Sequence, residues 1–104
     1  MDLAIIRRLC SEHKLEWTLH GTKRLLQRKI TAEEIDATVM NGDIIEEYAD
    51  DFPFPSCLIF GITPSGKKLH VLCAVGDDKL WIITAYEPNQ IDWDPSFKTR
   101  RRLQ

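Results

Sequence analysis

The chain has 104 residues, of which 43% are hydrophobic, and this is the size of one ordinary domain with a modest core. Its 14 basic and 16 acidic side chains leave a net charge of −2, which excludes a histone-like protein that attracts polyanions through its overall field. We therefore expect a single domain over residues 1–104, in which any contact with nucleic acid depends on local basic stretches.

The N-terminal stretch, residues 2–13, places apolar side chains at helical spacing and predicts an amphipathic first helix. Arg7 and Arg8 interrupt its apolar run and no small-residue cleavage site follows, so the stretch reads neither as a signal peptide nor as a membrane span. The expected location is the cytoplasm, away from any membrane, and the odd set of three cysteines fits a reducing compartment.

A second helix is predicted from Thr18 or Leu19 to about Arg28, and a helical wheel divides it into two sides. The apolar side carries Leu19, Thr22, Leu25 and Leu26. The polar side carries His20, Lys23, Arg24 and Arg28. We expect the apolar side to face the core.

A third helix is predicted from Ala32 to about Asn41. Thr31 and Glu34 have the spacing of a capping box, in which each side chain bonds the backbone amide of the other residue. Gly42 follows the helix and is expected in the left-handed conformation, which carries no Cβ penalty for glycine.

The pattern then changes to four strand-like runs joined by short turn-forming connections, which indicate antiparallel neighbours. These runs are residues 43–49, 56–63, 67–75 and 79–87. The predicted fold class is α+β, with the N-terminal helices packed on one face of a four-stranded antiparallel β-meander and the other face partly open. The tail from Pro88 onward has Trp93 and Phe97 to pack it against the domain.

Charge is segregated along the chain, because basic side chains gather in residues 20–29 and 98–102 whereas residues 43–51 are acidic. In the first basic stretch, His20, Arg24 and Arg28 follow at four-residue steps and share a helical face. An anion such as a phosphate would relieve the repulsion between the two arginines. A solvated helix face is the alternative interpretation.

His70 lies in the third strand-like run, and its neighbours depend on the turn at residues 76–79. In one register His70 faces Ala85, on the opposite side from Thr84 and Tyr86. In a second register, which needs a bulge at the turn, His70 faces Thr84 and shares a side with Tyr86. The second register would create a polar group suited to acid–base chemistry, and a satisfied core histidine is the alternative.

Cys57 and Cys73 both lie inside apolar runs and are expected as buried free thiols. A zinc site built from Cys57, His70 and Cys73 is the alternative, because thiolate and imidazole groups suit zinc. It lacks a paired CxxC motif and a clear fourth ligand, so we predict no metal and no cofactor.

Four blocks follow one another in the sequence, HGTKRLLQRKI, NGDIIEEYADDFPFPSCLIFG, LHVLCAV and WIITAYEPNQIDW. From about His20 to Trp93, their order and spacing resemble the bacterial DUF4258 family. That family is similar to the barnase, colicin and RelE-like group of ribonuclease folds, and its members resemble toxins of toxin–antitoxin pairs, often encoded beside a small zinc-finger antitoxin. The resemblance implies a RelE-like two-layer fold and a metal-independent endoribonuclease. It also implies RNA, including ribosome-associated mRNA, and a cognate zinc-finger antitoxin as partners.

The resemblance assigns the family's functional positions to His20, Arg24, His70, Thr84 and Tyr86. In metal-free RNA cleavage a base takes the proton of the 2′-hydroxyl, whose oxygen attacks the adjacent phosphate, and an acid protonates the leaving 5′-oxygen. We expect His70 or His20 to act as base and the other histidine, or Tyr86, as acid. Arg24 and Arg28 would stabilise charge on the phosphorane. Substrate binding is expected from Lys23, Arg28, Thr84, Arg100 and Arg101.

Two other classes of protein would use the same features. A non-catalytic RNA-binding or ribosome-binding module would use the basic face together with Arg100, Arg101 and Arg102, and would bind RNA without cutting it. A protein-interaction domain would dock a partner on its sheet edge or acidic segment. The sequence leaves the choice between monomer and dimer open.

Overall fold

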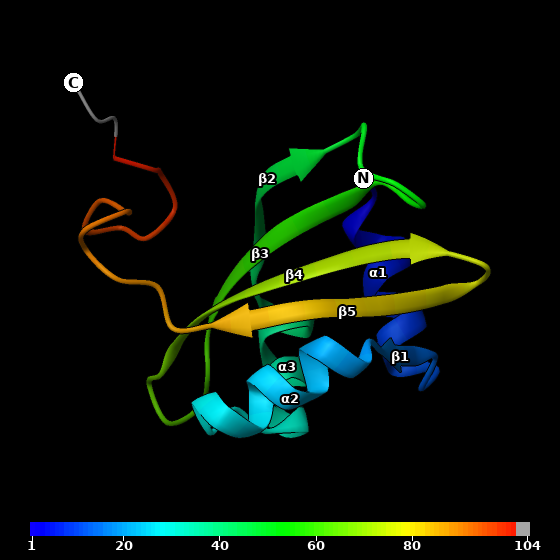
Figure 1. The fold of residues 1–104 in the computed structure, drawn as a ribbon, viewed down its shortest axis with the longest axis horizontal. Coiled ribbons are helices and arrows are strands. Elements are labelled where there is room, and N and C mark those ends of the chain that lie inside the picture. Colours follow the sequence, from blue (N-terminus) through cyan, green and yellow to red (C-terminus); the bar gives the residue numbers. More distant parts are fainter. Residues whose placement is uncertain (102–104) are drawn as a thin grey trace.

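The described residues, 1–101, form three helices and five strands in the computed structural model (Figure 1). The helices are α1 (Leu3–Ser11), α2 (Leu19–Arg28) and α3 (Ala32–Asn41). The strands are β1 (Leu15–Trp17), β2 (Asp43–Tyr48), β3 (Ser56–Ile62), β4 (Lys68–Gly76) and β5 (Lys79–Tyr86). They form one sheet in the order β1-β5-β4-β3-β2. Within residues 1–101, none of the helices is long and apolar enough to cross a membrane.

The α+β class is confirmed, but the sheet differs from the expected four-stranded antiparallel meander. β1 is an additional edge strand that pairs parallel with β5, so the sheet is mixed. The amide of Leu80 donates to the carbonyl of Lys14 just before this pairing begins, at 2.9 Å. A three-residue strand is too short to show alternation, so no pattern in the sequence marks it.

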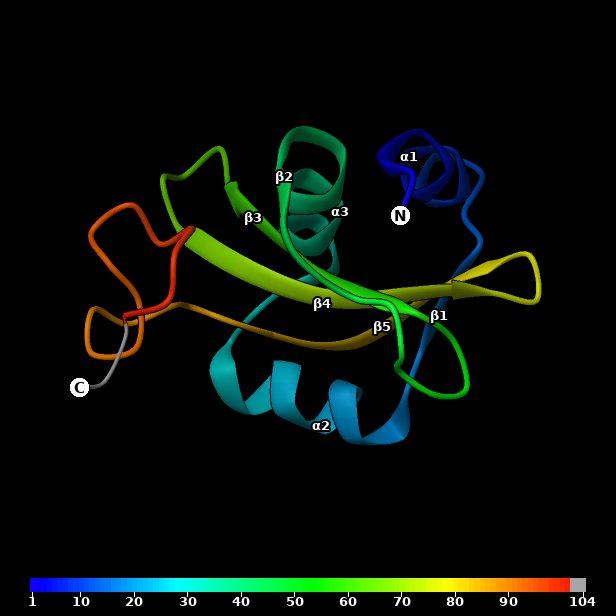
Figure 2. The same ribbon diagram turned by 90° about the horizontal axis from the view of Figure 1, so that it is seen from above.

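The helices lie on both faces of the sheet, whereas the sequence predicted one covered face. α1 and α3 cover one face, and α2 lies on the opposite face beside β5 (Figure 2). β1 carries the chain past the β5 edge from the first layer to the second. We call the face that carries α2 the open face, because α2 and the C-terminal segment, residues 88–101, cover only part of it.

The helical wheel placed Leu25 correctly in the core but was wrong for Leu19, Thr22 and Leu26. Gly21 and Leu25 are buried, whereas Leu19 and Leu26 are 76% and 77% exposed. Gly21 lies so close to β5 that a Cβ atom there would stand 2.6 Å from the carbonyl oxygen of Ile83. A backbone-to-backbone contact through glycine, which no hydrophobicity pattern registers, therefore sets the rotation of this helix.

The capping box predicted for α3 is present, with Thr31 and Glu34 as its two members. The residue after α3, Gly42, is extended at φ −90° and ψ −175°, so the expected left-handed conformation is wrong. A Cβ atom on Gly42 would stand 2.3 Å from the carbonyl oxygen of Phe60. Close approach to β3 explains the glycine there.

Most of the main core lies between the sheet and the α1–α3 layer, and Leu25 of α2 also belongs to it. Its fully buried members include Ile6, Ile35, Ile59, Val71 and Ile82. A second, smaller cluster lies on the open face, where Trp93 and Phe97 of the C-terminal segment pack with Leu58 and Phe60 of β3. The predicted packing role of Trp93 and Phe97 is confirmed.

The Gly21 contact gives a test of how α2 is held. Alanine is favoured over glycine in a helix by about 1 kcal/mol. We nevertheless expect Gly21→Ala to destabilise the protein by about 1–3 kcal/mol, because the added methyl group would collide with the β5 backbone. Urea unfolding measures the difference. The control is Gln27→Ala, an exposed position on the same helix, which should change the free energy of unfolding by less than about 0.5 kcal/mol.

Candidate functional site

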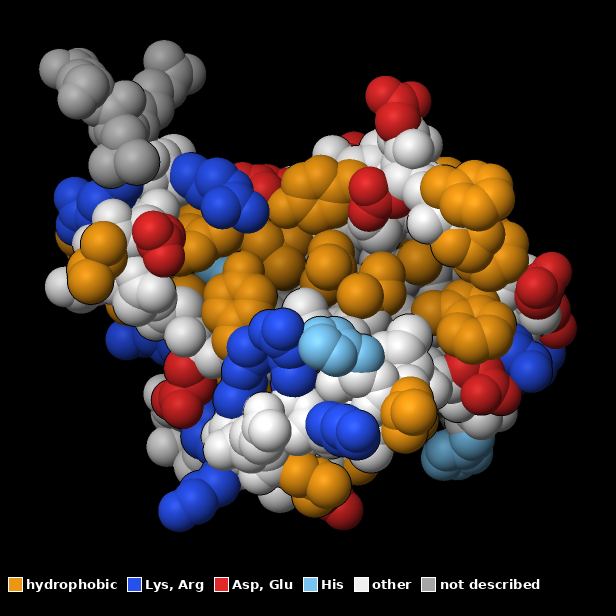
Figure 3. Space-filling model, viewed as in Figure 1, with side chains coloured by type: hydrophobic (Ala, Val, Ile, Leu, Met, Phe, Trp, Pro, Cys, Tyr) orange, Lys and Arg blue, Asp and Glu red, His pale blue; other side chains and the backbone are white. Residues whose placement is uncertain are grey.

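Two hollows lie next to each other on the open face of the sheet. The aromatic hollow, of about 290 Å³, is lined by Thr18, Asp51, Phe52, Pro53, Phe54, Ala74, Trp81 and Ile83. The polar hollow, of about 310 Å³, is lined by Tyr48, Asp51, Leu58, Leu72, Tyr86 and Arg100. Asp51 lines both, so the hollows are adjacent. Figure 3 shows the resulting apolar strip, with Lys, Arg and His side chains bordering it over α2.

A β-bulge between β4 and β5 decides which polar side chains meet in this face. Val75 pairs with Leu80 as in the first predicted register, but the register shifts between Leu72 and Cys73. Beyond the shift His70 pairs directly with Tyr86, and Thr84 pairs with Leu72. Neither predicted register is correct, because the bulge lies within the strand and not at the turn. The predicted group of His70, Thr84 and Tyr86 on one side of the sheet is nevertheless present.

His70 is fully buried and both of its ring nitrogens are hydrogen-bonded. Its Nε2 lies 2.6 Å from the carbonyl oxygen of Phe97. Since a carbonyl only accepts, Nε2 is the donor. In the neutral ring Nδ1 then accepts from the hydroxyl of Tyr86, at 3.2 Å. Burial is the main influence on the imidazole and lowers the pKa of His70, which favours this neutral form.

Aromatic rings surround His70 and the segment it holds. The His70 ring meets the rings of Trp93, Tyr86 and Phe60 edge-on, at centroid distances of 4.4, 5.2 and 5.8 Å. Phe97, whose carbonyl it binds, has φ of +60°, which is unfavourable for a residue with a side chain. His70 therefore ties a strained turn of the C-terminal segment to the sheet, and its imidazole has no surface with which to contact a ligand in this conformation.

Arg28 lies on the sheet side of α2, not on the solvent side that the wheel predicted. Its Nη1 donates to the carbonyl oxygen of Ala85 at 2.8 Å and to the hydroxyl of Thr84 at 3.2 Å. The rotation of α2 set by Gly21 brings this guanidinium to β5, next to Tyr86. Arg28, Thr84, His70 and Tyr86 thus come together in the structure.

Tyr86 lines the polar hollow together with Arg100, and the guanidinium of Arg28 is near enough to influence its phenol. Burial is the main influence on its phenol and raises the pKa of Tyr86, while the positive charges of Arg100 and Arg28 oppose this rise. Arg100 comes from the C-terminal segment, stacks 4.6 Å from the centre of the Trp93 ring and forms an ion pair with Glu46 at 2.9 Å. The carboxylates of Glu46 and Asp92 raise the pKa of Tyr86 further, so the phenol is neutral.

His20, Lys23 and Arg24 are exposed on α2, and within residues 1–101 no hydrogen bond or ion pair holds their side chains. Thr22 and Leu26 line a shallow hollow on the β1 side of the helix, so His20 and Arg24 occupy the flank toward the open face. His20 lies eight residues before Arg28, a distance of about 12 Å along the helix axis. The structure therefore does not bring His20 next to His70 and Tyr86.

Arg101 has a structural contact, since its Nε donates to the carbonyl oxygens of Gln90 and Trp93 at 2.6 and 2.9 Å. These bonds hold the segment that carries Arg100. The remaining arginine of the C-terminal basic stretch, Arg102, lies outside the described residues.

Cys57 and Cys73 are buried free thiols that pair across β3 and β4, with 3.8 Å between their sulfur atoms. They belong to the main core, whereas the ring of His70 packs on the open face with Trp93. The three ligands of the alternative zinc site therefore lie on opposite faces of the sheet. Among the described residues there is no group of three or more His, Cys, Asp or Glu side chains that could hold a metal ion.

The sequence interpretation missed the aromatic hollow. Phe52, Pro53 and Phe54 belong to a connection, DDFPFP, that was read only as a turn. A turn with two phenylalanines and two prolines is unusually apolar for a surface connection, and this composition was the available signal. Trp81 completes the hollow from β5, and the pairing of Ala74 with Trp81 depends on the register, which the sequence left open.

The fold and the site define an α+β protein whose open sheet face gathers a tyrosine, arginines and an aromatic hollow. The family model described as a domain of unknown function, DUF4258, matches residues 17–87. Because this match covers more than half of the chain, the protein belongs to the DUF4258 family. Neither a curated protein nor a solved structure matches the chain.

The hydrogen bonds of His70 predict a large effect of its removal on stability. We expect His70→Ala to lower the free energy of unfolding by about 3 kcal/mol, because it leaves a cavity and two unpaired polar groups. His70→Gln should cost at least about 1 kcal/mol less, since its amide nitrogen can still donate to Phe97. Urea unfolding of the three proteins measures this order. Equal losses in both variants would contradict a role for the bond to Phe97.

The lowered pKa of His70 predicts weaker folding in mild acid. Its pKa in the folded state lies below the ordinary value of 6.5, so the unfolded chain binds a proton first as the pH falls. The neutral His70 ring contributes to the free energy of unfolding, and this contribution is fully present above pH 6.5. Below pH 6.5 it decreases by at most about 1.4 kcal/mol per pH unit. Urea unfolding between pH 7.5 and 5.5 checks this slope. His70→Gln should flatten it, and an unchanged slope in that variant would refute the assignment.

Proposed function

We propose that this protein is a metal-independent endoribonuclease of the toxin–antitoxin type, with RelE-like character. The observation that carries the proposal is that Tyr86 and Arg100 line the polar hollow, while Arg28 is bound to β5 at Ala85, the residue before Tyr86. Two guanidinium groups beside a neutral phenol suit a phosphodiester, which carries negative charge and exchanges protons during cleavage.

Arg28 and Arg100 are assigned to the phosphate. Arg28 uses Nη1 for its bonds to β5, and a guanidinium has five N–H donors in all, so others remain for a phosphate oxygen. Arg100 is half exposed and pairs with Glu46 through Nε, and a bound phosphate would compete with this carboxylate. In the phosphorane the negative charge increases, so both contacts strengthen in the transition state.

Tyr86 is assigned to proton transfer, as the acid that protonates the leaving 5′-oxygen. Acid and base act on oxygens of one phosphorus, so His20, about two turns of α2 away from Arg28, does not serve as the base expected from the sequence. The proton of the 2′-hydroxyl passes to water in this proposal. His70 becomes a positioning residue in this proposal, because it accepts from the Tyr86 hydroxyl and is itself buried. The phenol has a single proton, so its bond to Nδ1 breaks when Tyr86 donates to the leaving oxygen. The roughly 12 Å between His20 and Arg28 along the axis places His20 at a neighbouring part of the RNA strand, which would lie along α2 over Lys23 and Arg24.

RNA, including mRNA on the ribosome, is the proposed substrate, and a cognate zinc-finger antitoxin is the proposed partner. The basic flank of α2 supports RNA as the substrate, because its local positive charge can attract RNA although the net charge of the chain is −2. β2 supports a protein partner, because it is an edge strand of the sheet and carries the acidic residues Glu46 and Glu47. An added strand from a partner could pair with such an edge.

Cleavage of a mixed-sequence RNA in the presence of EDTA tests the proposed function. We expect Arg28→Gln and Tyr86→Phe to slow cleavage about 10²- to 10³-fold, since each removes a donor to the reacting phosphate. Arg24→Ala, which changes a contact along the strand, should have a smaller effect. His20→Ala, which also changes a contact along the strand, should likewise have a smaller effect. The control is Arg8→Ala, an exposed arginine on α1 at the other face, which should cleave at the wild-type rate.

Circular dichroism of each variant must match the wild type, so that a lost activity is not a lost fold. Cleavage retained in both Arg28→Gln and Tyr86→Phe would contradict the assigned site. If the wild type binds RNA in low salt and releases it in high salt but never cuts it, the protein is a binding module and not a nuclease.

A further inference from the structure

The aromatic hollow has a preformed floor that its own backbone contacts hold in place. The rings of Phe54 and Trp81 stack with 6.3 Å between centroids and 27° between planes. A Cβ atom at Gly76 would stand 2.3 Å from the Phe54 ring, so glycine lets this ring lie directly against the strand backbone. The indole nitrogen of Trp81 donates to the carbonyl oxygen of Gly76 at 3.0 Å. Both rings are therefore fixed in orientation.

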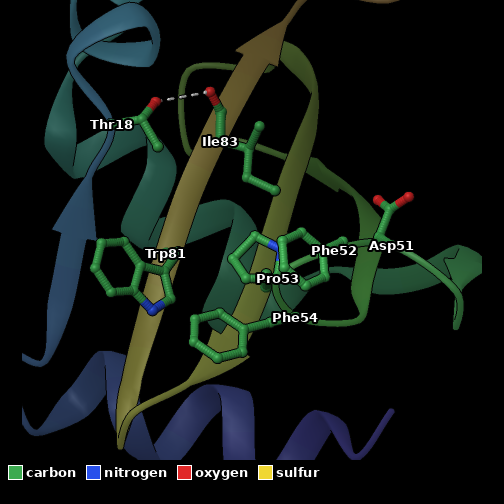
Figure 4. A pocket seen from close by; sticks show the side chains of 8 residues that line it. Thr18, Asp51, Phe52, Pro53, Phe54, Trp81 and Ile83 are labelled. Atoms are coloured by element: carbon green, nitrogen blue, oxygen red, sulfur yellow. Dashed lines mark hydrogen bonds between the residues drawn. The ribbon is translucent and has the colours of Figure 1, made fainter.

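Phe52 forms the exposed rim of the same hollow. Its side chain is 94% exposed, which is extreme for phenylalanine, and it lies beside Pro53 at the side of the hollow away from Trp81 (Figure 4). Exposure of the Phe52 ring to water is unfavourable, because the ring lacks the free energy that burial of apolar surface would provide. A flat apolar group placed in the hollow would cover Phe52 and both floor rings together.

The surroundings of the hollow favour a nucleobase as this group. On β4, Ala74 lines the aromatic hollow and Leu72 lines the polar hollow, two residues apart on one face and so about 7 Å from each other. Asp51 borders both hollows. The basic flank of α2, with His20 and Arg24, runs beside them and complements a phosphodiester backbone. An apolar peptide would not use these positive charges.

Most polar side-chain atoms that line the hollow are already hydrogen-bonded. The hydroxyl of Thr18 donates to the carbonyl of Ile83 and accepts from the amide of Gly21, and the carboxylate of Asp51 accepts from Ser56. Few groups therefore remain to recognise the edge of a particular base. Stacking on an aromatic surface tolerates any base, because every base has a π-face.

We propose that the aromatic hollow is a subsite for the nucleobase next to the phosphate held at the polar hollow, bound by stacking and with little base selectivity. The inference rests on the proposed function, because it takes RNA as the ligand of this face. It adds Phe52, Phe54 and Trp81 to the residues that bind the substrate.

Calorimetric titration with two deoxyribose tetramers tests this subsite without any cleavage, because neither has a 2′-hydroxyl. One tetramer carries four adenine bases and the other is abasic with the same phosphates. We expect the wild type to bind the adenine tetramer about 5- to 150-fold more tightly, which is the range for stacking one base. Phe52→Ala should reduce this ratio at least fivefold. Since Phe52 is almost fully exposed, the variant should fold normally.

Leu26→Ala is the matched control, because Leu26 is also highly exposed but lies on the other flank of α2. It should leave the ratio of affinities unchanged. Equal affinity for the two tetramers, no binding of either, or an unchanged ratio in Phe52→Ala would each overturn the subsite. Binding of N-acetyl-phenylalanine amide that depends on Phe52, without preference for the adenine tetramer, would assign the hollow to a protein partner and also overturn it. Base-dependent binding together with absent RNA cleavage would support the subsite and reject only the nuclease.

Discussion

The hydrogen bond from His70 to the carbonyl of Phe97 is the contact on which the open face depends. It joins the middle strand of the sheet to the C-terminal segment, which lies beyond residues 17–87 that the family model covers. The same ring fixes the hydroxyl of Tyr86 from its other nitrogen. Through this one imidazole, the phenol at the site and the segment that supplies Arg100 share a common support.

This arrangement explains why a histidine is buried here without a charged partner. A neutral imidazole offers one donor and one acceptor in a fixed geometry, and the carbonyl of Phe97 and the hydroxyl of Tyr86 use both. Neither contact needs a charge, so burial lowers the pKa of His70 and the neutral ring remains satisfied. The edge-on contacts with Trp93, Tyr86 and Phe60 then enclose the ring in an apolar environment. The buried ring of His70 therefore suits structural support of the site and not direct contact with a substrate.

The position of α2 has equal weight for function. Gly21 allows this helix to approach the β5 backbone, and the approach rotates Arg28 toward Thr84 and Ala85. The same rotation leaves Leu19 and Leu26 exposed, which hydrophobic burial alone would not favour. The helix thus forms one wall of the open face, and the connection that carries Phe52 and Phe54 forms another.

The sequence predicted the elements better than their arrangement. The three helices and the four longer strands were found close to their observed bounds, because apolar periodicity, the Thr31–Glu34 capping box and turn-forming residues act over a few neighbours. Of the candidate site, the shared face of His70, Thr84 and Tyr86 was predicted as one of two alternatives, although the observed register matches neither. The wheel of α2 misplaced Arg28, since it weighs side chains and not the close backbone contact at Gly21.

By itself, the sequence determined the α+β class, the helices and longer strands, the membership of the DUF4258 family and the residue types that any site must use. These depend on local patterns that each segment carries alone. Only the tertiary structure decided the parallel β1 strand, the placement of α2 on the opposite face, the bulge that pairs His70 with Tyr86, and the hollow under Phe52. Each of these features results from contacts between segments that are distant in the chain. Close approach of backbones and complementary shape determine such contacts, and a local hydrophobic pattern does not encode them.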